Sequence, residues 1–396
     1  MLAAPADAPK CMNAIFDGII LGTGHNALIL QAYLSRCGLR TLSVDRAPIP
    51  GGGLMTIDNP RLPGFRHNPH SFFHRAVTAM PWYRDLDLEH HGVRYLEPKL
   101  NVAMILRDGH PLEWWTDLDR TVASCAEFST RDADEVRRLA EEFKPIVEKI
   151  LLPEAQSPPL EPGLRRRLLE RSALGRRLLE ISALSPLEFV TRHFENDAVR
   201  AGLLFFNGLR EVDLRLKGFG HSIPALLASR TKAQMAVGGS ASLAHGLVAD
   251  ITQHGGEVQC GIELRHILVR NGRATGIELT TGEQQIHPSG FVASGLNPQQ
   301  TFLDLMPAEA VPASVREKAA QFQYNLLAPL FGLHLALDEP PRYAAAARHP
   351  ELNEARGVLI FSGKTCPAHS VAAGIRVLTR HGHPYSPELR SAARAG

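Results

Sequence analysis

The alternation of hydrophobic and polar positions predicts a β-α-β unit near the start of the chain. Residues 15–21 form a short, mostly apolar run rich in β-branched side chains, which is typical of a buried parallel strand. Apolar residues at helical spacing follow over 28–37, and Gly38 stands where a helix would end. A second apolar run over 39–44 leads directly into an acid, Asp45. The pattern therefore predicts a strand, a helix and a second strand in direct succession.

Further along, the pattern predicts a hairpin, a helical middle and a second α/β segment. Apolar runs over 102–106 and 111–115 flank Asp108-Gly109, which is a strong hairpin signal. Ser129 or Thr130 is positioned to cap the helix that follows. The remaining predicted elements are helices over 132–152, 163–182, 189–209 and 241–254, a strand over 257–260 and an antiparallel meander over 263–269, 275–279 and 283–293.

The turn after the first strand reads G-x-G-x-x-A, at Gly22, Gly24 and Ala27. Gly22 allows a tight turn, Gly24 lets a pyrophosphate approach the backbone, and Ala27 lets the helix pack closely on the strand. Free N–H groups and the helix dipole favour phosphate at the helix start. Asp45 would accept hydrogen bonds from the ribose of an adenosine. The unit predicts a dinucleotide site, and a glycine turn in an ordinary α/β protein is the alternative.

The unit continues as D-R-x-x-x-x-G-G, from Asp45 and Arg46 to Gly51 and Gly52. This pattern resembles the extended dinucleotide signature of FAD-binding two-domain oxidoreductases, in which the glycine pair passes close to the flavin diphosphate. A nicotinamide dehydrogenase does not need this pair. The pattern therefore favours FAD, and a flexible loop is the alternative.

Composition and charge narrow the function classes. The chain of 396 residues is long enough for two domains, and its 44% hydrophobic and 21% charged residues are typical of a globular protein. A net charge of +2 gives no reason to expect a nucleic-acid partner. The five cysteines lack a C-x-x-C pair, which argues against a redox disulfide or zinc site and favours a reducing, cytoplasmic location. We expect neither an export signal nor a membrane-spanning segment.

Histidines and aromatic residues gather in P-G-F-R-H-N-P-H-S-F-F-H, which follows the dinucleotide turn. By chain order this segment passes near the reactive end of a cofactor, so we expect His67 and His70 to orient a substrate. Their spacing is not that of the H-E-x-x-H signature, so no metal is expected. Surface histidines in an ordinary loop are the alternative. Trp114 and Trp115 either line an apolar substrate site or belong to the core.

The predicted helix over 163–182 is basic and amphipathic. Its apolar positions alternate with arginines, and such a helix can lie on an anionic membrane surface. We therefore expect peripheral membrane contact through this segment, with the solvated face of a packed helix as the alternative. The arginines are Arg165, Arg166, Arg167, Arg171, Arg176 and Arg177.

The order of motifs resembles that of the phytoene desaturase-related flavoproteins of the flavin amine oxidase superfamily. The similarity covers about residues 14–360 and is closest to the branch called pyridine nucleotide-disulfide oxidoreductase domain-containing protein 2. It rests on G-T-G-H-N at 22–26, P-G-F-R at 63–66, G-G-S at 238–240, Q-T-F-L-D-L at 300–305, L-D-E-P-P-R-Y at 337–343 and H-P-E-L-N at 349–353.

The resemblance implies an α/β fold with a Rossmann-like FAD-binding domain, residues 14–80 and 232–300, and an inserted, discontinuous α+β substrate domain, residues 81–231 and 301–360. It also implies hydride transfer from a carbon–carbon unit of an apolar, often isoprenoid, substrate to the flavin. The residues that would hold FAD are Gly22, Gly24, Ala27, Asp45, Arg46, Gly51, Gly52 and the backbone around Leu264.

The sequence departs from the family pattern after about residue 360. Members usually carry a G-x-x-x-x-G-G-G segment that closes over the flavin ring, and 361–396 holds no such segment. We expect 361–396 to be an atypical tail that leaves one wall of the flavin site open. Three functions remain: an FAD-dependent oxidoreductase, a flavin-fold protein without redox activity that acts as a binding or membrane-surface partner, and a nicotinamide enzyme.

Overall fold

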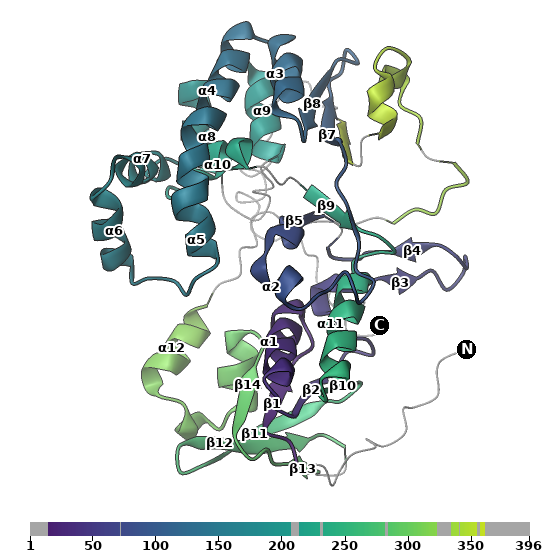
Figure 1. The fold of residues 1–396 in the computed structure, drawn as a ribbon, viewed down its shortest axis with the longest axis vertical. Coiled ribbons are helices and arrows are strands. Elements are labelled where there is room, and N and C mark those ends of the chain that lie inside the picture. Colours follow the sequence, from purple (N-terminus) through teal and green to yellow (C-terminus); the bar gives the residue numbers. More distant parts are fainter. Residues whose placement is uncertain are drawn as a thin grey trace, which may run out of the picture. The chain divides into compact units, whose positions relative to one another are not determined.

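The chain forms two compact units, and Figure 1 shows their elements in a computed structural model. The structure describes residues 15–71, 73–206, 214–229, 233–281, 284–322, 334–339, 341–354 and 357–360. Unit 1 comprises Met1–Leu96, Gln234–Tyr324 and Gly332–Ala336, and unit 2 comprises Glu97–Ala233, Asn325–Phe331 and Leu337–Gly396. The domain boundaries expected from the sequence stay a prediction, and the expected tail lies outside the described residues.

A four-stranded parallel sheet in the order β10-β2-β1-β14 is the centre of unit 1. β1 (Gly18–Leu21) and β2 (Thr41–Asp45) are joined by α1 (His25–Arg36), so the β-α-β prediction is confirmed. β10 (Glu257–Cys260) pairs with β2, and β14 (Phe291–Ser294) pairs with β1. The predicted α/β fold class is therefore correct.

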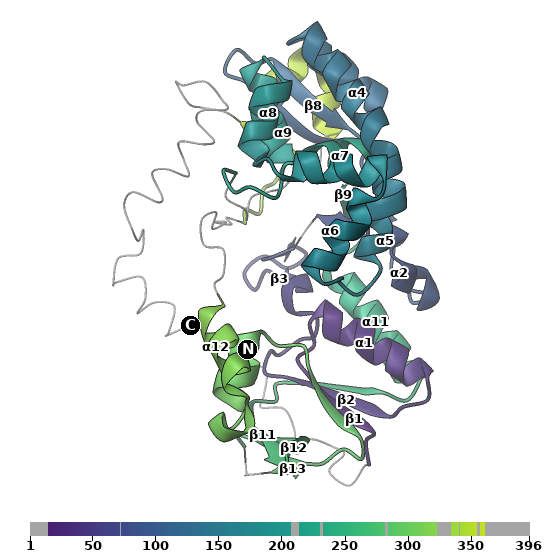
Figure 2. The ribbon, with the colours of Figure 1, turned by 90° about the vertical axis from the view of Figure 1, so that its left-hand side faces the viewer.

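Helices cover one face of this sheet, and an antiparallel sheet covers the other (Figure 2). On the first face, α1 and α11 (Ala241–Gln253) share a buried apolar cluster that includes Leu28 and Leu247. On the opposite face, β11 (Leu264–Arg270) and β12 (Arg273–Leu279) pack against the parallel strands. The buried residues of that second cluster are Phe16, Ile19, Leu21, Leu42, Val44, Ile267, Ile277 and Leu279.

A buried ion pair joins α1 to α11. Asp250 is fully buried, and its Oδ1 accepts hydrogen bonds from Arg36 Nε at 2.9 Å and Nη2 at 2.6 Å. His91 Nε2 lies 3.3 Å from the same oxygen. Because a buried carboxylate is strongly destabilising without a charged partner, this pair holds the end of α1 against α11.

Unit 2 combines a three-stranded sheet with a helical core. β7 (Leu100–Ile105) and β8 (Pro111–Trp115) form the predicted hairpin, and β15 (Gly357–Ile360) pairs parallel to β7. Trp114 and Trp115 are 5% and 2% exposed and belong to the buried apolar clusters, which agrees with the core alternative. The helices of unit 2 are α3 (Leu118–Ala126), α4 (Thr130–Ile146), α5 (Leu152–Ala155), α6 (Pro162–Glu170), α7 (Ala173–Ser182), α8 (Pro186–His193), α9 (Asp197–Phe206) and α10 (Ser222–Ala228).

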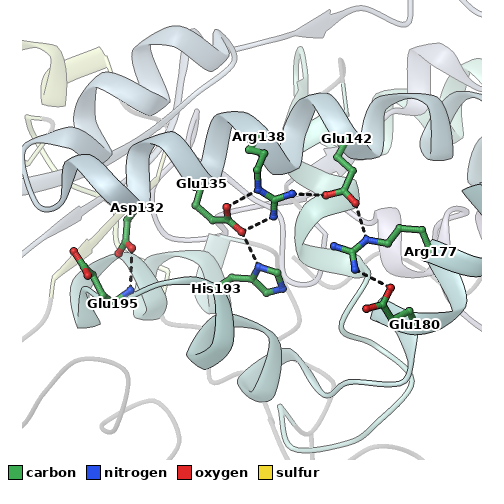
Figure 3. Close-up of polar contacts among 8 residues, drawn as sticks. All are labelled: Asp132, Glu135, Arg138, Glu142, Arg177, Glu180, His193 and Glu195. Carbon is green, nitrogen blue, oxygen red and sulfur yellow. Dashed lines mark hydrogen bonds and ion pairs between the residues drawn. The ribbon is translucent and has the colours of Figure 1, made fainter.

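Ion pairs follow one face of α4 and connect it to α7 and α8 (Figure 3). Arg138 bonds both Glu135, at 2.6 Å, and Glu142, at 2.8 Å, on its own helix. His193 of α8 lies 2.7 Å from Glu135, and Arg177 of α7 lies 2.6 Å from Glu142. Two of these contacts lie within α4, and the other two connect α7 and α8 to α4 through side chains that remain partly exposed.

The start of α4 is fixed by two capping contacts. Ser129 Oγ accepts a hydrogen bond from the Asp132 N–H at 3.1 Å, so Ser129 is the cap that the sequence left open. The fully buried Asp132 carboxylate in turn accepts the N–H group of Glu195 at 2.9 Å (Figure 3) and that of Asn196 at 2.8 Å. Asp132 thereby satisfies backbone donors in the turn that precedes α9.

The prediction of a single helix over 163–182 was wrong. The chain breaks between α6 and α7, where Ser172 Oγ accepts the Gly175 N–H at 3.0 Å and caps the second helix. A Cβ on Gly175 would lie 2.1 Å from the Leu169 carbonyl oxygen, so glycine permits this close turn. The predicted helix over 189–209 is likewise divided, into α8 and α9, and the part beyond α9 lies outside the described residues.

The predicted antiparallel meander is present, but its third strand, expected over 283–293, is shorter than predicted. Of the described residues in this range, Gln285–Ile286 form β13 and pair with β12, and the chain then crosses to the parallel sheet as β14. The segment that leads into β14 passes close to the backbone before β1, because a Cβ on Gly290 would lie 2.8 Å from the Asp17 carbonyl oxygen. The other strands and helices of unit 1 are β3 (Ile57–Asp58), β4 (Arg66–His67), β5 (His74–Arg75), β6 (Tyr95–Leu96), β9 (Ala233–Ala236), α2 (Pro81–Asp85) and α12 (Ala313–Gln321).

The buried carboxyl of Glu113 makes the stability of unit 2 depend on pH. Glu113 is 8% exposed on β8, and its Oε2 accepts the Trp115 indole N–H at 2.9 Å. Burial, and then the neighbouring Glu351 carboxyl, raise the pKa of Glu113 from 4.5 to about 7. The folded state therefore binds more protons than the unfolded state between these values, so stability falls as pH rises through this window and levels off above it.

We predict that Glu113→Gln removes this pH dependence, because the amide oxygen still accepts the indole N–H but carries no charge. The variant should be more stable than the wild type at about pH 8, and its profile should lack the part of the decline between about pH 5 and pH 7 that Glu113 causes. Urea unfolding followed by tryptophan fluorescence measures this. The exposed Glu141→Gln is the control, and a parallel decline in the Glu113→Gln and wild-type profiles would contradict the prediction.

Candidate functional site

The turn from β1 to α1 has the open geometry expected of a phosphate-binding turn. Gly22 has φ 90°, and a Cβ there would lie 3.1 Å from a Leu296 methyl carbon. Gly24 has an ordinary φ of −63°, and a Cβ there would meet no atom within 4 Å. Gly24 is the N-cap of α1, and no side chain caps it. The start of α1 therefore offers backbone N–H groups beside open space.

The second glycine segment lies against this turn. The Gly51 N–H donates to the Thr23 carbonyl at 2.9 Å, and Gly24 and Gly51 form an isolated parallel bridge. Gly51 has φ 117° and Gly52 has φ 56°, conformations that glycine adopts without strain. A Cβ on Gly52 would lie 3.2 Å from the Gly24 Cα, so the two backbones touch. Residues 22–24 and 51–52 therefore lie side by side and form a continuous surface of backbone atoms.

Ala27 is small for a reason that the sequence did not reveal. Its side chain is 4% exposed, and its Cβ would lie 2.8 Å from a Cβ placed on Gly295. The Gly295 N–H donates to the Leu21 carbonyl at 2.8 Å, which brings the end of β14 close to α1. The small side chain of Ala27 therefore allows Gly295 to approach α1, in addition to the expected packing of the helix on β1.

Thr23 connects the two glycine segments to Asp45, and the sequence reasoning missed it. Asp45 Oδ2 accepts the Thr23 N–H at 2.7 Å and the Thr23 hydroxyl at 2.8 Å, and Oδ1 accepts the Ala47 N–H at 2.9 Å. Thr23 is fully buried. The sequence feature that could have identified Thr23 is its position, since it is a hydroxyl residue between two glycines at the end of a predicted buried strand. We call residues 22–24, Asp45 and residues 51–52 the glycine clasp.

Asp45 retains capacity for a ligand. An ionised carboxylate has about four acceptor positions, and three bonds from the chain occupy part of them. Asp45 is partly exposed. One further hydrogen bond, such as one from a ribose hydroxyl, is compatible with the arrangement.

A cavity of about 190 Å³ lies beside the glycine clasp. This is smaller than the roughly 300–1,000 Å³ of sites that enclose a whole ligand, so it suits one part of a dinucleotide. Half of the residues predicted to bind FAD line the cavity, and the other half lie in the clasp and in α1. The predicted residues that line the cavity are Gly22, Asp45, Arg46 and Leu264.

Backbone contacts hold the cavity wall that contains Leu264. The Ile262 N–H donates to the Asp45 carbonyl, and the Gly261 N–H donates to the Ala47 carbonyl, both at 2.8 Å. The segment between β10 and β11 is thereby held at the end of β2.

Gln300 and Asp304 add polar groups to the cavity, and neither was proposed as a site residue. They lie on the π-helical turn Gln300–Leu305, inside the Q-T-F-L-D-L motif. The Asn297 side chain accepts the Gln300 N–H at 2.9 Å and donates to the Gln300 side chain at 2.7 Å. The motif therefore contributes a positioned polar edge to the site.

His67 and His70 do not line this cavity. His67 lies on β4, its Nε2 is 3.2 Å from the Asn59 amide nitrogen, and its ring centroid is 5.3 Å from that of His334. His70 is exposed. Their role toward a substrate stays a prediction. Among the described residues, no group of three or more His, Cys, Asp and Glu side chains is placed to hold a metal ion.

The arginines of the 163–182 segment are largely engaged within unit 2. Arg165 bonds Glu154, Arg166 bonds Glu170, and Arg177 bonds Glu142 and Glu180. Arg176 donates to the Glu170 carbonyl at 2.8 Å. No described helix combines the length and apolar character needed to cross a membrane.

Comparison with known proteins identifies distant relatives. No family model matches the chain. One of the subunits of limonene dehydrogenase from Castellaniella defragrans is 27% identical over 347 residues, which cover 86% of this chain and 62% of the relative. Pyridine nucleotide-disulfide oxidoreductase domain-containing protein 2 of Rattus norvegicus is 24% identical, covering 87% and 63%. Phytoene desaturase (lycopene-forming) of Pseudescherichia vulneris is 22% identical, covering 81% and 63%. The chain thus spans less than two thirds of the length of each relative.

Solved structures share the fold. An oxidoreductase from Methanosarcina mazei has a TM-score of 0.55 at 16% identity, covering 77% of this chain and 65% of that one. Putrescine oxidase bound to putrescine has a TM-score of 0.53 at 14% identity, covering 79% and 65%.

The parallel sheet and these matches define the fold class as an α/β fold that the chain shares with solved oxidoreductase structures. Within this class, the chain is a distant homologue of the limonene dehydrogenase protein, pyridine nucleotide-disulfide oxidoreductase domain-containing protein 2 and phytoene desaturase. The family resemblance seen in the sequence motifs is therefore confirmed.

We predict that Thr23→Val lowers the free energy of unfolding of unit 1 by about 1–2 kcal/mol, because Val keeps the shape but leaves the Asp45 carboxylate without the hydroxyl donor. Urea unfolding followed by circular dichroism measures this. Thr275→Val is the matched control, since that hydroxyl makes one 3.4 Å contact with the Leu268 carbonyl. Equal stability of the two variants would show that the clasp does not depend on the Thr23 hydroxyl.

Proposed function

We propose that the chain is an FAD-dependent oxidoreductase of the dehydrogenase or desaturase type, which moves a hydride from a carbon–carbon unit of an apolar substrate to the flavin. The single observation that supports it most is the glycine clasp, in which two glycine segments touch and leave open space at Gly24. Limonene and phytoene, named in the relatives, are both apolar isoprenoids, which supports an isoprenoid substrate class.

The residues present fit FAD. The uncapped start of α1 suits the pyrophosphate, because the N–H groups and the helix dipole favour negative charge there. The remaining acceptor capacity of Asp45 suits a ribose hydroxyl, and the backbone at Leu264 lies on the same cavity. Gly51 and Gly52 allow the chain to pass close to the diphosphate. Arg46 is exposed at the rim of the cavity, where its charge would favour an anionic ligand.

FAD supplies the redox chemistry in this proposal, as the acceptor of a hydride. The protein contributes binding, orientation and exclusion of water around the reacting atoms. A nicotinamide cofactor could bind at the same β-α-β turn, but its binding would not require the glycine pair at 51–52. The pair therefore favours FAD.

We predict that Gly24→Ala weakens FAD binding by about 10- to 100-fold, because the new methyl group occupies space that the pyrophosphate needs. The fold should be unchanged, since Gly24 has a φ of −63° and its Cβ would contact nothing. Fluorescence titration with FAD, together with urea unfolding, measures both effects.

Gly53→Ala is the matched control for this experiment. Gly53 lies outside the left-handed region, and a Cβ there also meets no atom within 4 Å. Wild-type affinity in Gly24→Ala would contradict the assignment of the site. Binding of NADH without FAD would instead support the nicotinamide alternative. FAD that binds but is not reduced anaerobically by any apolar alkene or isoprenoid substrate would favour the non-redox alternative.

The non-redox alternative includes contact with a membrane surface, and one observation favours it. The exposed leucine stripe consists of Leu164 and Leu168, one turn apart on α6 and 39% and 41% exposed, and of Leu160, which precedes the helix and is 45% exposed. Arg167 and Arg171 flank this stripe, and neither makes an ion pair with a described residue. An exposed leucine stripe flanked by cationic groups suits an anionic lipid surface.

We predict that the chain co-sediments with phosphatidylglycerol vesicles and not with phosphatidylcholine vesicles. Replacing both Leu164 and Leu168 by Ser should abolish this, because burial of the leucines supplies the apolar part of the binding energy. The control replaces Leu30 and Leu216, which are 43% and 52% exposed, by Ser. The membrane-surface proposal would be refuted if both double variants lost co-sedimentation equally. It would also be refuted if the wild-type chain bound neither kind of vesicle.

A further inference from the structure

A buried histidine near the glycine clasp has one nitrogen with no hydrogen-bond partner in the part of the chain that the structure describes. His74 lies on β5, its residue is 6% exposed, and its Nδ1 is 2.7 Å from the Tyr95 hydroxyl. Its Nε2 is buried and has no hydrogen-bond partner among the described residues. Burial, and then the nearby imidazole of His25, lower the pKa of His74, so the free protein holds it neutral.

The unpaired nitrogen is unfavourable in the protein alone. Leaving a buried polar group without a partner costs about 1–3 kcal/mol. When the Tyr95 hydroxyl donates to Nδ1, the proton of the neutral imidazole is on Nε2, which then requires an acceptor. A ligand that supplies this acceptor recovers the lost interaction.

Two observations place His74 close to the glycine clasp. The Ser71 N–H donates to the carbonyl of Gly53, next to the glycine pair, at 3.2 Å. His74 follows Ser71 by three residues, and such a segment spans at most about 10 Å. On the other side, His25 is the first residue of α1, adjacent to Gly24, and its imidazole contributes to the lowered pKa of His74. The histidine therefore lies near the helix terminus that favours phosphate.

We propose that His74 binds the dinucleotide directly, with Nε2–H donating a hydrogen bond to the pyrophosphate received at the start of α1. This inference rests on the proposed function and adds a residue that the glycine motifs do not include. Tyr95 acts as a positioning residue, because its hydroxyl holds Nδ1 and directs the opposite nitrogen toward the ligand. The interaction is charge-assisted, since the acceptor is an ionised phosphate.

Two substitutions separate binding by Nε2 from structural support by Nδ1. The amide nitrogen of Gln reaches the position of Nε2, whereas that of Asn reaches only the position of Nδ1. His74→Asn should therefore keep the contact with Tyr95 and weaken FAD binding by about 10- to 100-fold, the range for a hydrogen bond to a charged group. His74→Gln should restore most of the affinity.

The probes are FAD, ADP and riboflavin, titrated against each full-length variant by calorimetry, with urea unfolding to compare stability. ADP carries the diphosphate without the flavin, so its affinity should fall with that of FAD in His74→Asn. Loss of FAD affinity with unchanged ADP affinity would overturn the assignment to the pyrophosphate. If His74→Asn kept the FAD affinity and His74→Gln lost it, His74 would act only through Tyr95, and the proposed contact with the pyrophosphate would be refuted.

Failure of this inference can be distinguished from failure of the proposed function. If the wild type binds FAD and ADP and His74→Asn binds them equally well, only the role of His74 is refuted. If the wild type binds neither nucleotide, the FAD site itself is refuted, and the role of His74 is refuted with it.

Discussion

The arrangement of the candidate site depends on the hydrogen bonds of one buried residue, Thr23. Its N–H and hydroxyl both donate to Asp45 at the end of β2, and its carbonyl accepts the N–H of Gly51. One residue thus connects the β1–α1 turn, the second strand and the glycine pair. Because polar groups in a buried environment must all be satisfied, few other arrangements of these segments are compatible with burial. The start of α1 takes its position from this constraint.

α1 is held at its other end by a different interaction. Arg36, the last residue of the helix, bonds the buried Asp250 of α11, 214 positions later in the sequence. Apolar packing between the two helices fills the space between these points. A helix fixed at both ends presents its N-terminal N–H groups in a constant direction, which is what recognition of a phosphate group requires.

Unit 2 is stabilised in another way. Its core is a large apolar cluster under several short helices, and α4 carries a row of ion pairs to α7 and α8 (Figure 3). Because Arg177 and its neighbours use their charges inside the unit, the basic character of the 163–182 segment is weaker at the surface than in the sequence. What remains exposed is the leucine face of α6 with Arg167 and Arg171.

Local patterns determined the β-α-β unit, the Asp108-Gly109 hairpin, a helix cap at Ser129 or Thr130 and the distant flavoprotein homology, because each depends on short motifs of neighbouring residues. Patterns of hydrophobicity did not reveal the break at Ser172 or the crossing of β14 to the parallel sheet. A cap and a close carbonyl contact decide the first, and pairing with β1 decides the second. The roles of Thr23, Gly295 and His74 depend on contacts with residues distant in sequence. Only the tertiary structure brings these groups within hydrogen-bonding or van der Waals distance, and so only it decides which of them form the site.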